Sequence, residues 1–510
     1  MMKKLFASKS VLAILIIIFF SILIRCSAQE LIRPEGKRFS ETWMGIYING
    51  VKIGYSHSQE FLLVRNGEKY LKNLQMSFMK ISRLGSNPVE LLTTEETLYD
   101  VNRNPVRTVI KTKMSESETI IEIKYFPNKI VFKLGKNINE VPYKEKFYLG
   151  VPLEKIIKEG KLKPGNKFNF KILDVISRSI INTHFEVIGK EEVLILGRKM
   201  SLWHVREDKS GSALSRIVDE WIDDEGQIWK QVVKSSFLTT ISIRMSKEKA
   251  LEISEENFDI ALSTAIKSNI KFKNPQKIKS VTFKISGIPP HKIKNFPCDD
   301  GSQAILKIER DYAIIKTSAR IFHEEEAILL PIKDEGFSKY LKSTSFCQAD
   351  DPEIRRTAKQ IIGDERNSWR AAKKIAEWVN RKMTPDYDIG FATAKEILKN
   401  LKGDCSEYTV ITVALCRAAG IPARAAIGIM HAHGIFLGHM WLEVYVGQWL
   451  NLDTKWLAID KRTGEYYTDA THIKFGRSNL DENIFKDISQ AVSGIIGKLK
   501  IEILDYLERE

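Results

Sequence analysis

From about Arg38 to Ala250, apolar and polar residues alternate in short runs that end in turn residues. A period of two is typical of strands that bury one face, because successive side chains point to opposite sides of a sheet. Asn49-Gly50 and Asn66-Gly67 lie between such runs, and the Asn-Gly pair favours the tight turn of a hairpin. The pattern predicts an antiparallel β domain, which we assign to residues 29–270.

The chain has 510 residues, which is too long for one hydrophobic core, so further domains are expected. Alternation returns between Ile278 and Thr317, and residues 271–345 are predicted to form a β-rich linking region. A polar, lysine-rich segment marks the boundary at residues 271–277. The linking region fits equally well as the end of the first domain.

Residues 346–510 show a different pattern and are predicted to form an α+β domain that ends in a helix and a strand. Helical periodicity runs from Pro352 to Lys382, and a further helix is expected from Ala394 to Leu401. A buried helix is then predicted to begin at Cys405. It is followed by three expected strands, at Ala423–Met430, His439–Val446 and Gln448–Asp453.

The N-terminus has the pattern of a secretory signal. Three lysines precede an apolar run from Val11 to Ile24, and small residues follow at 26–28. The run is short for a membrane-spanning helix. We predict a signal peptide over residues 1–28 and a periplasmic or secreted protein, with retention of the segment as a membrane anchor as the alternative.

The formal net charge is +15 at pH 7. No basic run is interleaved with aromatic residues, which argues against a nucleic-acid partner. We interpret the charge as a solvated, lysine-rich surface. Anionic envelope polymers or lipid surfaces are the alternative explanation of the same charge.

The segment Gly403–Tyr408 has the features of a reactive cysteine site. Gly403 supplies a turn, and Asp404 and Glu407 have the spacing of a capping box at the start of a helix. Cys405 would then lie at the helix N-terminus, whose amide groups and dipole stabilise a thiolate. The pattern predicts an activated thiol nucleophile.

A nucleophilic cysteine needs a base, and His439 and Asp453 follow Cys405 in the sequence. Gly447 lies near the middle of the interval between them, so two antiparallel strands that meet there would bring the two side chains together. The imidazole would accept the thiol proton, and the carboxylate would orient and stabilise the imidazolium. The predicted catalytic residues are Cys405, His439 and Asp453.

The other cysteines of the predicted mature chain have less definite roles. Cys298 and Cys347 lie in polar, turn-like segments, and outside the cytoplasm they are equally consistent with a disulfide and with two free thiols. Cys416 lies about 16 Å along the same predicted helix from Cys405, too far for a disulfide. We interpret it as a core residue.

Several motifs resemble the transglutaminase-like superfamily in its exported microbial branch. They are Gly403–Tyr408, Ala414–Arg424, His439–Tyr445, Leu452-Asp453 and Asp469–Ile473. The resemblance covers Ala392–Phe475 and implies a papain-like core with a triad of Cys405, His439 and Asp453 that acts through a thioester. The chain departs from the pattern after Asp453, where proline is common and where Thr454 and Lys455 stand.

Other histidines near these motifs are not assigned to chemistry. His431 and His433 lack a carboxylate or cysteine at ligand spacing, so no metal is predicted. Both are expected to line the substrate approach or to sit in a mobile loop that runs to Gly438. His472 is assigned a structural role. No cofactor is predicted.

The leading hypothesis is an exported enzyme that acts on peptide or carboxamide bonds, with hydrolysis slightly favoured over acyl transfer to an amine. Its partner would be a protein or peptide substrate, such as a cell-wall peptide. The alternative is an envelope binding or scaffold protein whose β domain carries the function and whose triad is idle. The sequence does not fix the oligomeric state.

Overall fold

A computed structural model describes residues 36–82, 88–114, 117–135, 137–175, 177–209, 216–235, 238–253, 258–387, 391–460, 464–495 and 497–509. The predicted signal peptide, residues 1–28, lies outside the described residues. The described chain forms two compact units, one up to Phe258 and one from Asp259 onwards. Among the described helices, none is long and apolar enough to cross a membrane.

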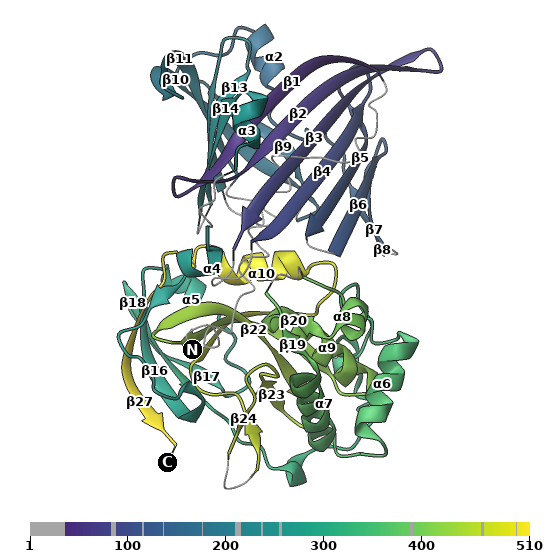
Figure 1. Ribbon diagram of the computed structural model, residues 1–510, viewed down its shortest axis with the longest axis vertical. Helices are drawn as coiled ribbons and strands as arrows, with labels where there is room; N and C mark the ends of the chain where they lie inside the picture. The colour runs from purple at the N-terminus through teal and green to yellow at the C-terminus, as the bar shows by residue number, and fades with distance from the viewer. Residues whose placement is uncertain are drawn as a thin grey trace. The chain divides into compact units, whose positions relative to one another are not determined.

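The unit up to Phe258 contains a fourteen-stranded sheet in which every strand pair is antiparallel (Figure 1). Its strands are β1 (Lys37–Ile48), β2 (Val51–Arg65), β3 (Glu68–Ile81), β4 (Val89–Tyr99), β5 (Pro105–Met114), β6 (Ser117–Tyr125), β7 (Lys129–Leu134), β8 (Asn137–Pro142), β9 (Lys167–Asp174), β10 (Ser179–Ile195), β11 (Arg198–Asp208), β12 (Arg216–Ile222), β13 (Ile228–Ser235) and β14 (Thr239–Met245). The short helices α2 (Leu153–Lys158) and α3 (Lys247–Leu251) complete the unit.

Sequential strands pair as hairpins from β1 to β8 and from β9 to β14, and β1 also pairs with β14, which joins the two halves of the sheet. The predicted hairpin turn at Asn49-Gly50 is present between β1 and β2, with φ of 49° and 83° at its two residues. Both values lie in the left-handed region that glycine and asparagine tolerate best. The large antiparallel β region predicted from the alternating pattern is confirmed.

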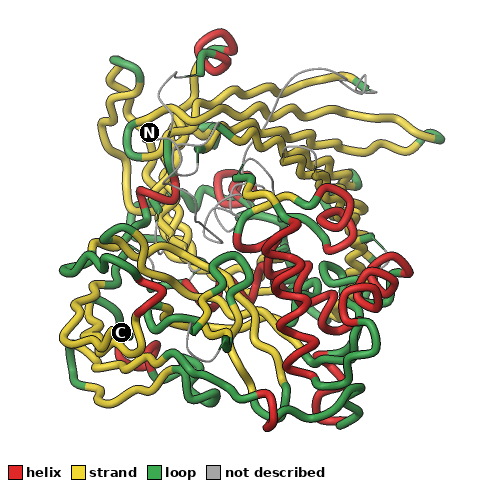
Figure 2. Tube along the Cα trace, turned by 60° about the horizontal axis from the view of Figure 1, so that its bottom comes forward, coloured by secondary structure: helices red, strands yellow, loops and turns green. Residues whose placement is uncertain are grey.

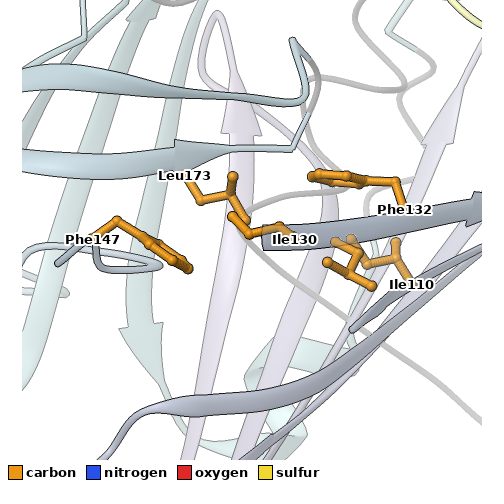
Figure 3. Packing of buried hydrophobic residues seen from close by; sticks show 6 residues of the cluster. Ile110, Ile130, Phe132, Phe147 and Leu173 are labelled. Atoms are coloured by element: carbon orange, nitrogen blue, oxygen red, sulfur yellow. The ribbon is translucent and has the colours of Figure 1, made fainter. Parts of the chain in front are cut away.

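One buried cluster of this unit is formed by side chains from several strands and one loop (Figure 3). Ile110, Ile130 and Phe132 come from β5 and β7, and Leu173 comes from β9. Phe147, from the loop after β8, packs among them. Burial of these apolar side chains on one face of the strands explains the alternation seen in the sequence.

The unit from Asp259 onwards is a mixed α/β structure. Its helices are α4 (Ile260–Ser263), α5 (Pro290–Ile293), α6 (Pro352–Ile362), α7 (Ser368–Lys382), α8 (Ala394–Asn400), α9 (Cys405–Ala418) and α10 (Ile484–Val492). Its strands are β15 (Ile266–Lys267), β16 (Ile278–Ser286), β17 (Gln303–Ile308), β18 (Tyr312–Ser318), β19 (Thr384–Pro385), β20 (Lys402–Gly403), β21 (Ala423–Ala432), β22 (Ile435–Tyr445), β23 (Trp449–Leu452), β24 (Ala458–Ile459), β25 (Tyr466–Tyr467), β26 (His472–Ser478) and β27 (Lys500–Glu508).

Helix α9 lies at the centre of this unit. It packs on β21 and β22 of a five-stranded sheet and contacts α6, α7 and α8. Figure 2 shows helices of this unit, in red, lying beside its yellow strands. Every residue from Cys405 to Arg417 is buried. The sheet has the order β15-β22-β21-β26, with β23 beside β22. A buried helix between other helices and a sheet is the arrangement that the apolar sequence of α9 predicts.

Two details differ from the sequence prediction or extend it. The helical stretch from Pro352 to Lys382 is divided into α6 and α7, because α6 ends at Gly363 with a positive φ of 61° and Asn367 caps α7. The last strand, β27, pairs with β16 in a four-stranded sheet of order β17-β18-β16-β27. The C-terminus therefore completes a sheet that begins in residues 271–345.

A buried ion cluster joins that region to the central sheet. The Lys474 ammonium group of β26 contacts the carboxylates of Asp300 and Glu443, and all three side chains are almost fully buried. Arg424 and Arg477 also pair with Glu443, at 2.5 and 2.7 Å. Because buried charges need partners, this cluster fixes Asp300 against β22 and β26.

Candidate active site

Cys405 is the first residue of α9, and the capping box predicted from the sequence is present. The Asp404 side chain accepts a hydrogen bond from the Ser406 amide at 2.8 Å, and the Asp404 amide donates to Glu407 at 2.9 Å. Gly403 has a φ of 155°, and a Cβ there would lie 2.2 Å from the Glu407 Cβ. The turn into α9 therefore requires glycine.

The structure brings His439 and Asp453 together. Nε2 of His439 in β22 lies 2.7 Å from Oδ2 of Asp453, and both side chains are buried. Asp453 follows β23, whose last residue Leu452 pairs with Leu442 of β22. The proximity follows from two neighbouring antiparallel strands, as the spacing around Gly447 predicted. The other oxygen of Asp453, Oδ1, accepts backbone amide hydrogen bonds that hold the carboxylate in place.

The start of α9 lies against β22 beside His439. The Thr409 hydroxyl, one turn after Cys405, donates to the Met440 carbonyl at 3.1 Å. The backbone of Met440 also hydrogen-bonds the Cys405 thiol. Nδ1 of His439 is buried and has no hydrogen-bond partner in the described part of the chain. One ring nitrogen of His439 therefore hydrogen-bonds Asp453, and the other has no partner among the described residues. The residue after His439, Met440, contacts the thiol of Cys405.

The electrostatics of the thiol differ from the sequence prediction. Cys405 is 1% exposed, and this burial raises the pKa of its thiol well above the usual value, with the Asp404 carboxylate adding to the effect. The charge of Lys455 and the Met440 hydrogen bond oppose the rise without cancelling it. This direction is opposite to the stabilised thiolate predicted from the sequence, because burial disfavours the charged form of the thiol.

Burial also determines the protonation of the base. It lowers the pKa of His439, although the Asp453 carboxylate opposes this. Burial alone would raise the pKa of Asp453, but the charges and hydrogen bonds of His439 and His472 hold it well below its usual range. Near neutral pH the site therefore contains a neutral thiol, a neutral imidazole on His439 and an ionised carboxylate.

Sequence reasoning assigned His472 a structural role and did not predict its contact with Asp453. Its Nε2 lies 3.2 Å from Oδ2 of Asp453, and its Nδ1 lies 3.3 Å from Oδ1 of Asp469. Burial opposes its charge, yet the carboxylates of Asp469 and Asp453 raise its pKa to about 10. His472 is therefore a cationic donor to Asp453. The signal in the sequence was an aspartate three residues before a histidine in the Asp469–Ile473 motif.

Nitrogen and oxygen atoms of His439, Asp453 and His472 lie within 4.8 Å of one another, as a metal site would require. However, both histidines direct Nε2 to the same oxygen of Asp453. With its pKa raised to about 10, His472 carries a proton on both ring nitrogens, whereas a metal-binding nitrogen must be unprotonated. The donor set therefore fits a His–Asp–His hydrogen-bonded chain better than a metal centre.

His431 does not have the role expected of it, whereas His433 lies in a turn between two strands. His431 is fully buried, and its Nε2 hydrogen-bonds the Ile270 carbonyl at 3.0 Å. Its ring packs edge-on against Phe272 and Phe436, so it belongs to the core and does not line a substrate path. His433 is the first residue of the turn between β21 and β22, with a positive φ of 54°.

The remaining cysteines do not take part in this site. Cys298 and Cys347 are free thiols in this structure, so of the two alternatives left open by the sequence it contains the unbridged one. Burial raises the pKa of Cys347 to about 11. Cys416 is fully buried in α9, as expected of a core residue.

Residues 355–458 match the transglutaminase-like superfamily. The match includes Cys405, His439 and Asp453, and together with the mixed α/β unit it shows that the chain contains a transglutaminase-like superfamily domain. Members of this superfamily are typically cysteine-dependent hydrolases or transferases.

An uncharacterized protein of Haemophilus influenzae is 35% identical over 108 residues, which are 19% of this chain and 29% of that protein. A proposed cysteine protease from Cytophaga hutchinsonii is 16% identical, with a TM-score of 0.31 over 46% of this chain and 91% of its own. A proposed protease from Parabacteroides distasonis is 10% identical, with a TM-score of 0.20 over 88% of this chain and 70% of its own. TM-scores this low establish no shared fold.

Proposed function

We propose that the protein is a cysteine-dependent enzyme that acts on peptide or carboxamide bonds through a thioester at Cys405. The observation that carries this proposal is the buried His439 ring, with Nε2 on Asp453 and an unpaired Nδ1 beside the backbone that contacts the thiol. An imidazole held in this way can accept a thiol proton and pass it on.

In the proposed reaction, Sγ of Cys405 bonds to the substrate carbonyl carbon while Nδ1 of His439 takes the thiol proton. The tetrahedral intermediate collapses, the C–N bond breaks, and the leaving amine or ammonia takes that proton. Water or a second amine then attacks the thioester and restores the thiol. Backbone amides at the start of α9, including that of Cys405, lack intrahelical acceptors and are the proposed oxyanion donors.

Before substrate binds, the Cys405 thiol and the His439 imidazole are both neutral, so the mechanism requires a proton to move between them. Proton transfer from thiol to imidazole creates an ion pair in a buried site, where separated charges are costly. Asp453 offsets this cost because it stabilises the imidazolium, and His472 holds Asp453 ionised. The chain from His472 through Asp453 to His439 is therefore the part of the site that makes the proton transfer feasible.

We favour hydrolysis slightly over transfer, because no described feature reserves the thioester for an amine acceptor. The proposed substrates are proteins or peptides, such as cell-wall peptides. We further propose that the protein is exported, which rests on the charge and apolar pattern of residues 1–28. In this proposal the large β region binds or positions the substrate, although an idle triad with a purely binding β region is the competing possibility.

The test is to incubate protein lacking residues 1–28 with a glutamine-rich protein or cell-wall peptides and to measure released ammonia and new amino groups. A labelled primary amine in the same mixture distinguishes transfer from hydrolysis. We expect release that depends on Cys405, with little amine incorporation. Equal product from wild type and Cys405→Ala would contradict the proposal, and absence of product with every substrate class would favour the binding role.

A further inference from the structure

Near the nucleophile, the structure buries a lysine whose ammonium group has no hydrogen-bond partner among the described residues. Lys455 is 8% exposed, and its Nζ has no hydrogen-bond partner in the described chain. Its Nζ lies 4.5 Å from the ring centre of Tyr387 and 5.6 Å from that of Tyr408. Aromatic faces offset part of the cost of burying a cation, but a buried charge normally has an anionic partner.

A second polar group in the same place is also unsatisfied. The hydroxyl of Tyr387 is buried and has no hydrogen-bond partner among the described residues. Tyr387 therefore contributes both the ring under the Lys455 ammonium group and an unpaired hydroxyl. Buried polar groups are rarely left unpaired in folded proteins, so two together indicate a place where a ligand supplies the missing acceptor.

The position of this pair relative to Cys405 follows from the surrounding elements. Tyr408 lies one turn after Cys405 on α9, and the Lys455 amide hydrogen-bonds Asp453. Lys455 is close enough to both Cys405 and His439 for its charge to act on them. Lys455 and Tyr387 thus lie within electrostatic range of Cys405.

No carboxylate among the described residues hydrogen-bonds either donor. Oδ1 of Asp404 accepts from the amide and hydroxyl of Ser406, and Oδ2 of Asp453 is held by His439 and His472. Within the described part of the chain, both donors are therefore available to an acceptor from a ligand. A carboxylate can accept hydrogen bonds from an ammonium group and a hydroxyl at the same time.

We propose that Lys455 and Tyr387 form a subsite for a substrate carboxylate located next to the bond that Cys405 attacks. The substrate class is then acidic, for example a peptide with a free carboxylate adjacent to the scissile amide. This inference rests on Cys405 as the nucleophile of the proposed function. Lys455 is a specificity-determining residue here, and it also stands where the sequence departs from the family pattern.

The test compares two alkylating reagents that differ only in charge and react without turnover. In both, Sγ of Cys405 bonds to the reagent carbon as iodide leaves, but iodoacetate carries a carboxylate and iodoacetamide carries a neutral amide. The measured quantity is the ratio of their second-order rate constants at Cys405, followed by mass spectrometry of the full mature chain. A change in thiolate population alters both rates equally and leaves the ratio unchanged.

We expect Lys455→Met to lower the ratio of iodoacetate to iodoacetamide rates about tenfold or more, the size of a charge-assisted hydrogen bond. Lys455→Arg should retain most of the preference, and Tyr387→Phe should lose a smaller part. The matched control is Lys402→Met, which removes an exposed positive charge just before the turn into α9 at Gly403. This control should leave the ratio unchanged.

Three results would overturn the inference. They are a ratio that Lys455→Met does not change, an equal loss with Lys402→Met, and failure of both reagents to reach Cys405 in the folded protein. The outcome is separable from that of the proposed function. If the Lys455-dependent preference is present but no thioester forms with any amide, the subsite stands and the proposed chemistry fails.

Discussion

At the scale of single residues, the candidate site depends on a competition between burial and charge. The helix N-terminus and the capping box around Cys405 are local features, so the sequence predicted them correctly. The burial of the thiol and the contact of His472 with Asp453 depend on segments distant in the chain, so local patterns did not reveal them. The unpaired ammonium group of Lys455 is likewise visible only in three dimensions.

Asp404→Asn tests how charge controls the thiol. Asparagine is about as good an N-cap as aspartate, so the free energy of unfolding should change by less than about 0.5 kcal/mol. Removal of the carboxylate charge should lower the pKa of Cys405, because that charge contributes to its rise. The pH profile of iodoacetamide alkylation should therefore move to lower pH. An unchanged profile, or a shift to higher pH, would contradict the electrostatic account.

His472 should make stability dependent on pH in a defined direction. Its pKa is raised to about 10 in the folded protein, above the ordinary value near 6.5. Its ion pairs therefore contribute fully below about pH 6.5, and this contribution is lost as the pH rises through about 10.

Urea unfolding of wild type and His472→Gln at several pH values measures this contribution. The stability difference between the two proteins should be largest at neutral pH and below, and it should shrink toward pH 10 and above. Groups that titrate in both proteins cancel in the difference. A constant difference across that range would show that His472 is not held protonated by Asp469 and Asp453.

At the scale of elements, local turn and cap signals predicted where several helices and strands begin or end, whereas their packing partners depend on long-range contacts. The Asn49-Gly50 hairpin and the start of α9 follow from a few neighbouring residues. The pairing of β27 with β16 and of β15 with β22 joins segments far apart in the sequence. Periodicity identifies a strand but does not identify its neighbour, and this is why these pairings were not predicted.

The entry into α9 should be intolerant of any side chain at Gly403. In Gly403→Ala, the new Cβ would lie 2.2 Å from the Glu407 Cβ at a positive φ, so the capping box must shift. We expect a loss of about 2 kcal/mol or more in the free energy of unfolding, from strain and overpacking. Thermal or urea denaturation measures it.

Gly464→Ala is the matched control for that substitution. Gly464 also has a positive φ, of 71°, but no atom of the described residues lies within 4 Å of its Cβ position. Gly464→Ala should lower the free energy of unfolding by about 1 kcal/mol, which is the contribution of backbone strain alone. If the two variants lost the same stability, close packing against Glu407 would not be what selects glycine at position 403.

At the scale of the whole molecule, the sequence predicted a large antiparallel β region followed by a mixed α/β region, and both are present. It did not reveal that the fourteen strands form one sheet, because β1 pairs with the distant β14. It also did not reveal the burial of Lys474 with Asp300 and Glu443, because charged residues are normally predicted to lie on the surface. The division of the chain at residues 270 and 345 remains a prediction.

Lys474→Met tests whether that ion cluster holds residues 271–345 to the central sheet. Removal of the ammonium group leaves two buried carboxylates without their shared cation, which should cost about 3–5 kcal/mol. Urea unfolding of the whole chain measures the loss. Lys284→Met, which removes a partly exposed lysine paired with Glu502 at 3.6 Å, is the control and should cost less than about 1 kcal/mol. A similar small cost for Lys474→Met would show that the cluster does not stabilise the unit.

The central claim is that Cys405, supported by His439 and Asp453, forms a thioester with an amide substrate. The direct measurement is rapid acid quenching of the mature protein with cell-wall peptides or a glutamine-rich protein, followed by peptide mass mapping. We predict an acyl adduct on the peptide that contains Cys405, removable by hydroxylamine, absent in Cys405→Ala and much reduced in Asp453→Asn. Substrate turnover without any adduct at Cys405, or an adduct unaffected by Asp453→Asn, would contradict the account.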